Sequence, residues 1–200
     1  RKAKAPPGGN GPMTRLPYAD PAAMDEETGA LFARLAPLNI FRVMAHSGPA
    51  LRGFLKLGNA LLYKGRLDPI LREMAIVRTG LLCGSRYEVH QHEMISRDLG
   101  MAPEKLAALG EGAEAPVFTE LERLVLRFTD EVTRDVKASE VTFRALAERL
   151  GPAEMVELTL TVGFYGLVSR FLETMEIEIE EGLAGPPMKL PRRPVQDPKR

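Results

Sequence analysis

The sequence predicts an all-α fold, and three observations carry that prediction. Apolar residues recur three and four positions apart through most of the chain, which is the spacing of one face of a helix. No segment shows the alternation of apolar and polar residues that is typical of a half-buried strand. Prolines stand near the first position of several predicted helices, where a missing N–H is tolerated, at Pro49, Pro69, Pro103 and Pro152.

Nine helices are expected in chain order. Periodicity alone predicts the first two, over residues 24–35 and 39–46. The next two, residues 48–63 and 69–82, begin near a proline that has a cap or turn residue, Ser47 or Asp68, beside it. An S-x-x-E signal predicts a fifth helix over 85–98. The remaining helices are expected over 103–109, 119–135, 139–149 and 153–181.

The last predicted helix is the longest and contains two glycines, Gly163 and Gly166, within an apolar stretch. A glycine inside a helix costs about 1 kcal/mol relative to alanine. We therefore expect the backbone of this helix to approach a neighbouring element closely at these positions.

Composition limits the classes of function. Two hundred residues, 44% hydrophobic and 27% charged, are typical of one soluble globular domain. A formal net charge of zero argues against a nucleic-acid surface. The longest apolar run, residues 158–168, is far shorter than the ~20 residues of a membrane-spanning helix, and no secretory signal is evident. A cytoplasmic protein without a membrane or nucleic-acid partner is expected.

The two ends of the chain differ in composition from its middle. Residues 1–12 are basic and rich in Pro and Gly, and we expect a disordered tail, or residues that precede a native start at Met13. Residues 183–200 are Pro-rich and basic, and we expect a second disordered tail, although such a segment could bind a partner in extended form. The helical domain is expected over residues 13–182.

Residues 71–99 concentrate the groups that could carry chemistry. In the first predicted helix of this stretch, Glu73 lies among the apolar residues Ile70, Ile76 and Val77, an unusual position for a carboxylate. In the second, His92 falls on the apolar face with Glu88 one turn before it. The opposite face, which includes Arg86 and His90, is predicted to be solvated, so the two histidines of this helix are expected to point in different directions.

These residues resemble the carboxymuconolactone decarboxylase family, which includes the alkylhydroperoxidase D branch. The family pattern is an L-R-E opening on one helix, a C-x-x-C at the start of the next, and a histidine four residues after the second cysteine. Leu71-Arg72-Glu73 matches the opening, and His92 matches the histidine. The segments 39–42 and 45–47 add to the likeness, which extends over residues 30–182.

Both cysteines of the family pattern are missing. Ser85 and Glu88 stand at their positions, and the one cysteine, Cys83, lies two residues before the first of them. The thiol chemistry of the family therefore cannot be carried over, and the chain is similar to the branch that lacks the cysteine pair. The resemblance implies an alkylhydroperoxidase D-like helical bundle intertwined in a homodimer, trimer or hexamer, with no cofactor and no metal.

A functional interpretation makes Glu73, Glu88 and His92 a set of catalytic residues that handle protons. The substrate would be a small anionic lactone or oxo acid. Its binding residues are expected to be an arginine that holds the anion and neighbouring hydrogen-bonding groups, from the set Arg78, Ser85, Arg86, Tyr87 and His46. Loss of carbon dioxide from a carboxymuconolactone-like substrate would leave a dienolate, which needs a proton donor nearby.

Structural interpretations of the same residues stay open. Ser85 and Glu88 fit a capping box, in which each side chain satisfies a backbone N–H. His92 could be a hydrogen-bonded core histidine, Glu73 a partner for an arginine, His46 a residue at a helix C-terminus, and Cys83 a small buried residue. A metal site is not expected, because His90 and His92 point about 200° apart around a helix.

Three functions remain after these considerations. The first is a thiol-independent enzyme of the carboxymuconolactone decarboxylase type. The second is an alkylhydroperoxidase-like or peroxiredoxin-like oxidoreductase, which the missing dithiol weakens. The third is a non-catalytic helical oligomer that binds a ligand in the inherited pocket.

Overall fold

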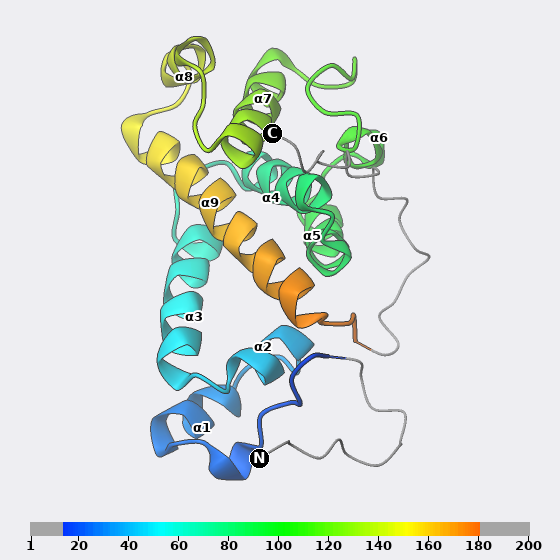
Figure 1. Cartoon of the computed structure of the whole chain (residues 1–200). Coiled ribbons are helices and arrows are strands. Elements are labelled where there is room, and N and C mark those ends of the chain that lie inside the picture. The colour runs from blue at the N-terminus through cyan, green and yellow to red at the C-terminus, as the bar shows by residue number, and fades with distance from the viewer. Residues whose placement is uncertain (1–13, 181–200) are drawn as a thin grey trace, which may run out of the picture.

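The computed structural model describes residues 14–180 and shows only helices, turns and connecting segments there, with no strand, which confirms the all-α prediction (Figure 1). The predicted tails, 1–12 and 183–200, lie outside the described residues. The elements are a short 3-10 turn, η1 (Pro21–Ala23), followed by α1 (Glu26–Phe32), α2 (Asn39–Met44), α3 (Gly48–Tyr63), α4 (Pro69–Cys83), α5 (Arg86–Asp98), α6 (Pro103–Ala108), α7 (Glu120–Asp135), α8 (Glu140–Ala147) and α9 (Pro152–Met175).

Helix α4 is the central element of the fold. It packs against α5, α7 and α9, and its residues from Leu71 to Leu81 are all buried (Figure 1). Its first turn is set by Pro69 at a position that needs no N–H donor and by Asp68, whose side chain accepts hydrogen bonds from two backbone N–H groups of that turn. Because this helix is covered on all sides, its polar side chains are shielded from water. They therefore need partners within the protein.

The apolar core has two parts that share α4 and α9. One part joins α4 to α7 and to the first half of α9, with Met74, Leu126 and Leu158 fully buried. The other joins α2 and α3 to the second half of α9, with Leu51 and Leu172 at its centre. Since α5 packs on both α4 and α9, its inward face lies where these two parts meet.

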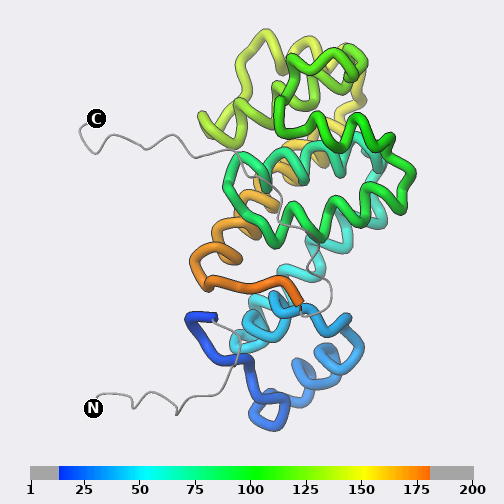
Figure 2. Tube along the Cα trace, turned by 90° about the vertical axis from the view of Figure 1, so that its right-hand side faces the viewer, coloured from blue at the N-terminus to red at the C-terminus, as the bar shows by residue number. Residues whose placement is uncertain are grey.

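The segment after α9 turns back against α2 and α5. Figures 1 and 2 both show it, in orange, next to the blue α2. Asn39, the first residue of α2, donates its backbone N–H to the Glu180 carboxylate at 2.6 Å and its side-chain amide to the Glu178 carbonyl at 3.0 Å. This segment, residues 177–180, therefore belongs to the folded domain.

Two expectations about the last helix are wrong. It ends at Met175 rather than at 181, because Glu176 adopts a left-handed conformation with φ of 52° and the chain leaves the helix there. The glycines do not mark a close approach of backbones within the described chain. A Cβ at Gly163 would meet nothing within 4 Å, and one at Gly166 would meet only the side chain of Arg170, from the same helix.

Helix α9 is long and apolar enough to cross a membrane by length and composition alone, and it is the one such helix in the described part of the chain. Within this fold 56% of its most apolar stretch is buried. It crosses the molecule as a core helix against α4 and α7. The absence of a membrane partner stays an expectation, as does the homo-oligomer.

Candidate active site

The site begins with two adjacent charged residues of α4. Arg72 and Glu73 are both buried, and the Arg72 Nε donates a hydrogen bond to Glu73 Oε1 at 3.0 Å. The Glu73 side chain is 0% exposed. Burial of a carboxylate is costly unless charge and hydrogen bonds compensate it, and Arg72 supplies part of that compensation.

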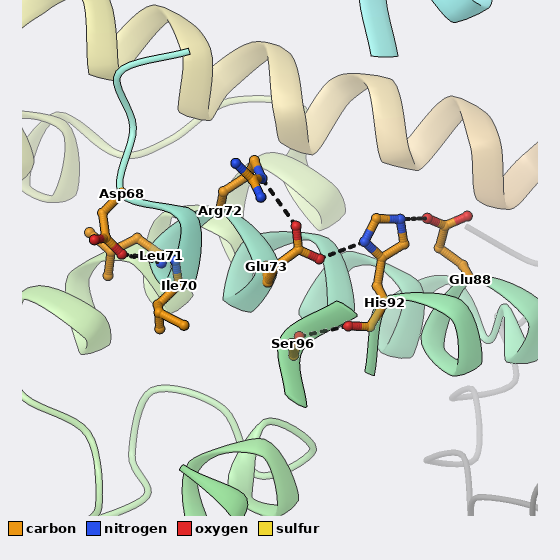
Figure 3. Close-up of polar contacts among 8 residues, drawn as sticks. All are labelled: Asp68, Ile70, Leu71, Arg72, Glu73, Glu88, His92 and Ser96. Carbon is orange, nitrogen blue, oxygen red and sulfur yellow. Dashed lines mark hydrogen bonds and ion pairs between the residues drawn. The ribbon is translucent and has the colours of Figure 1, made fainter. Parts of the chain in front are cut away.

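His92 of α5 supplies the rest. Its Nδ1 lies 2.6 Å from Glu73 Oε2, on the side of the carboxylate that Arg72 leaves open (Figure 3). Because an ionised carboxylate only accepts, the proton of this hydrogen bond is on Nδ1. The Ser96 hydroxyl donates to the His92 carbonyl at 2.6 Å, and the edge of the ring meets Tyr165 of α9 at 4.7 Å between centroids. The imidazole is thus held in one orientation.

Glu88 lies on the other side of the ring, one turn before His92 on α5. Its Oε1 is 3.2 Å from His92 Nε2, close enough for an ion pair but without the alignment of a hydrogen bond (Figure 3). Within the described residues this buried oxygen has no hydrogen-bond partner. His92 therefore lies between two carboxylates, one of which holds it firmly while the other keeps its hydrogen-bonding capacity.

The capping-box interpretation of Ser85 and Glu88 is wrong. Ser85 occupies the N-cap of α5, but its side chain makes no capping hydrogen bond, and its buried Oγ has no partner among the described residues. Glu88 does not reach back to the cap either, since no hydrogen bond joins it to the backbone there. The S-x-x-E signal correctly predicts where the helix starts, but neither side chain caps it.

Burial and mutual charge set the protonation of the pair. Desolvation raises the pKa of Glu88 to about 7; the positive charge of His92 opposes that rise, and the Glu73 carboxylate adds to it. For His92, burial acts to lower the pKa, but the hydrogen bond to Glu73 and the charges of Glu88 and Glu73 outweigh it, and the net shift is upward. The carboxyl group of Glu88 can thus gain or lose a proton near neutral pH, with the imidazole of His92 beside it as the partner acid or base.

A cavity of about 300 Å³ opens beside this pair. Helices α3, α5 and α9, with α2 and the turn before it, form its walls, and Glu88, His92 and Tyr165 are part of its lining. Aromatic rings from three helices line the rest, since Phe54 contacts both Phe41 and Phe164, with centroids at 6.4 Å and 4.9 Å. The acid–base pair is therefore accessible from a small, largely apolar pocket.

The other residues that the sequence proposed lie in different places. Tyr87 lines the pocket and donates its hydroxyl to Glu180 at 2.6 Å. Arg78 is buried on another face of α4, where it binds Asp130 through two hydrogen bonds of 2.6 and 2.8 Å, so it does not line the pocket. Arg86 is exposed and lies outside the lining as well.

The two remaining residues with sequence-based expectations, His46 and Cys83, also lie away from the pocket lining. His46 follows the end of α2, is exposed, and donates from Nε2 to the Pro17 carbonyl at 2.7 Å. Cys83 is buried at the last position of α4. The prediction that His90 is solvated is only partly right, because its ring is half-buried and its Nε2 is inaccessible to water.

Three residues of the site escaped the sequence analysis. Tyr165 lies in the middle of a long apolar helix, where it looks like any core aromatic. Gln91 lines the pocket and donates to Glu180 at 3.0 Å. Glu180 binds Tyr87, Gln91 and the start of α2 together. No local pattern predicts this role, because the residues it joins are about ninety or more positions away along the chain.

Comparisons with known proteins relate the sequence to one family. The sequence model of the carboxymuconolactone decarboxylase family matches residues 48–131. The uncharacterized protein YnjA of Escherichia coli K12 is 27% identical over 124 residues, which are 62% of this chain and 68% of that protein. The chain is therefore similar to the carboxymuconolactone decarboxylase family over residues 48–131.

Solved structures show the same fold. An uncharacterized peroxidase-related protein from Ralstonia eutropha JMP134, described as an alkylhydroperoxidase core, aligns with a TM-score of 0.75 and 23% identity, over 86% of this chain and 95% of its own. A peroxidase-related protein from Silicibacter sp. TM1040 aligns with a TM-score of 0.74 and 20% identity, over 87% and 96% of the two chains. The debrominase Bmp8, solved as a cysteine variant in complex with 2,3,4-tribromopyrrole, aligns with a TM-score of 0.66 and 16% identity, over 78% and 84%.

Proposed function

We propose that this protein catalyses thiol-independent proton transfer on a small molecule held in the pocket, with Glu88 as the residue that exchanges the proton with it. The observation that carries the proposal is the state of Glu88. Its carboxyl group is buried, borders the pocket and has an oxygen without a hydrogen-bond partner in the described chain. A buried polar atom in this state is a place where a ligand would complete the hydrogen bonding.

In this proposal His92 is the proton partner of Glu88. Glu73 fixes the ring through Nδ1, which directs Nε2 to Glu88 at 3.2 Å. One proton can then reside on either group, and Glu88 acts as base when it is on His92 and as acid when it is on the carboxyl. Arg72 balances the charge of Glu73, and Glu73 orients His92. Neither Arg72 nor Glu73 lines the pocket, so both are positioning residues.

The reaction that fits this set is removal and return of a proton at a carbon next to a carbonyl group. The Glu88 carboxylate takes the proton, and the electron pair of the C–H bond moves onto the carbonyl oxygen as an enolate. Tyr165 lines the same pocket, and burial followed by the charge of Glu88 raises its pKa well above the usual 10, so its hydroxyl stays a hydrogen-bond donor. Return of the proton to the same or a conjugated carbon completes the exchange or a double-bond shift.

Decarboxylation of an anionic lactone would use the same protonation step but also needs a group that holds the carboxylate. The arginines expected to do this, Arg78 and Arg86, lie outside the pocket lining. Peroxide reduction would depend on Cys83, which does not line the pocket and is the chain's one cysteine. The geometry therefore supports proton transfer over both alternatives.

The test is incorporation of solvent deuterium into a panel of small ring ketones and lactones, followed by nuclear magnetic resonance, with 4-carboxymuconolactone as the charged member. Exchange by the wild type that is lost in Glu88→Gln, and kept in Glu93→Gln and Cys83→Ser, is the expected result. Glu93 is a matched control because it lies on the same helix and pairs with Arg97 away from the pocket. Undiminished exchange in Glu88→Gln, or its loss in Cys83→Ser, would contradict the proposal.

A further inference from the structure

The charge of the pocket narrows the kind of ligand that it can take. Among the described residues that line it, none is a lysine or arginine. His92 is the one lining residue that can carry a positive charge, and both of its ring nitrogens already face carboxylates, Glu73 at 2.6 Å and Glu88 at 3.2 Å. Arg72, the nearest guanidinium behind it, is bound to Glu73. Within residues 14–180, no positive charge of the lining is left for an anionic ligand.

Carboxylates, in contrast, lie both in the lining and next to it. Glu88 is part of the lining. The Glu180 carboxylate lies outside the lining and accepts hydrogen bonds from the pocket residues Tyr87 and Gln91 at 2.6 and 3.0 Å. These two donors are groups that could otherwise have turned toward a ligand carboxylate. An anion entering the pocket would lose its hydration and meet like charge.

The shape and the surface of the pocket favour a ring. Phe41, Phe54 and Phe164 come from three different helices and meet within the lining at centroid separations of 4.9 and 6.4 Å. Such rings bind a flat apolar molecule by stacking or edge contacts. The volume of about 300 Å³ limits the ligand to a small one. Among the described lining residues, Glu88 Oε1 is the one buried side-chain atom that has no hydrogen-bond partner.

We infer that the ligand of this pocket is an uncharged, small, mostly apolar ring compound that carries one hydrogen-bonding group, which meets Glu88. This inference names the substrate class of the proposed proton transfer. That the ligand is a substrate rests on the proposed function. It replaces the anionic lactone or oxo acid that the sequence predicts. The ring packs among the phenylalanines while its polar group completes the hydrogen bonding of Glu88.

Indole derivatives provide matched probes, because the chain contains no tryptophan and no indole of the protein contributes to the signal. The neutral probe is 3-methylindole, the anion is indole-3-acetate and the cation is tryptamine, all with the same ring. Fluorescence anisotropy at pH 7 measures the affinity of each. We expect 3-methylindole to bind at least tenfold more tightly than indole-3-acetate, because the described lining has no positive charge free to pair with the anion. It should also bind more tightly than tryptamine, because Glu88 is already paired with His92 and an ammonium group would lose its hydration in a mostly apolar pocket.

Two variants of α3 locate the binding site. A Cβ at Gly58 would lie 3.4 Å from the Phe164 ring inside the pocket lining, so Gly58→Leu should fill the cavity and weaken 3-methylindole binding at least tenfold. At Gly53, on the same helix, a Cβ meets nothing within 4 Å, so Gly53→Leu is the matched control and should leave binding unchanged. A probe without the N–H donor, 1,3-dimethylindole, should bind more weakly than 3-methylindole.

The outcomes separate this inference from the proposed function. Equal or tighter binding of indole-3-acetate or tryptamine, no binding of 3-methylindole, or binding that Gly58→Leu leaves intact would overturn the inference. If 3-methylindole binds as expected while deuterium exchange does not depend on Glu88, the ligand class stands and the proposed reaction fails. If 4-carboxymuconolactone is turned over in a Glu88-dependent manner, the reaction class stands and the uncharged ligand is wrong.

Discussion

Replacement of Glu88 by glutamine should remove the decrease in stability that this carboxyl group causes as the pH rises from 4 to 8. The pKa of Glu88 is raised from the ordinary 4.5 to about 7, first by burial. Between these two values the folded protein holds a proton that the unfolded chain releases, so the free energy of unfolding falls as the pH increases. Glutamine has the shape of the protonated carboxyl group and cannot ionise. The variant therefore lacks the loss of stability that ionisation of Glu88 causes.

The magnitude follows from the shift. A difference of about 2.5 pKa units corresponds to about 3 kcal/mol. The free energy of unfolding is lower by this amount above pH 7, and it is not reduced below pH 4.5. His92 contributes in the same direction, because its raised pKa gives stability that is complete below the usual 6.5 and is lost as the pH passes the higher folded value. Glutamine at position 88 also removes the part of the His92 shift that the Glu88 charge causes.

The assay is urea unfolding followed by circular dichroism at pH 4, 6 and 8 for the wild type, Glu88→Gln and the control Glu93→Gln. We expect Glu88→Gln to gain about 3 kcal/mol relative to the wild type at pH 8 and to match it at pH 4. Glu93→Gln should follow the wild-type dependence on pH. Parallel curves for the wild type and Glu88→Gln would show that folding does not raise the pKa of Glu88, and the assignment of its proton-exchanging role would fail.

Three further predictions concern residues around the site. Arg78→Ala should destabilise the protein by about 3 kcal/mol, because it removes the bidentate partner of Asp130, which keeps Arg134, and leaves two carbonyls of the α6–α7 connection without their donor. Arg97→Ala removes a guanidinium that is 58% exposed and should cost under about 1 kcal/mol. Urea unfolding measures both, and equal costs would contradict the structural role of Arg78. Gly84→Ala should cost about 1 to 2 kcal/mol in the same assay because Gly84 ends α4 at a φ of 72°, and a neutral result would rule out that conformation. Cys83→Ser should keep its deuterium exchange and show no change in peroxide consumption, and a peroxidase activity lost in this variant would restore the thiol alternative.

Much of the fold could be predicted because the signals for helices are local. Pro69 after Asp68 and the S-x-x-E beginning at Ser85 lie within one helical turn of the ends they mark, and α4 and α5 start within a residue of the prediction. The end of α9 was predicted wrongly because the sequence after Met175 remains compatible with a helix. The chain leaves the helix there, and residues 177–180 bind α2 and α5 instead.

The sequence by itself determined that the protein is helical, where its central helices begin, and that Glu88 and His92 lie on one face of α5, because all of these depend on residues within a few positions of one another. Only the tertiary structure decided that Glu73 meets His92 across two helices, that Arg78 binds Asp130 instead of a ligand, and that Glu180 occupies the donors of Tyr87 and Gln91. Each of these contacts joins residues 19 to 93 positions apart, and it exists because the apolar faces of α4, α5, α7 and α9 bury one another. The same burial raises the pKa of Glu88 toward neutrality, so packing rather than local sequence gives the site its chemistry.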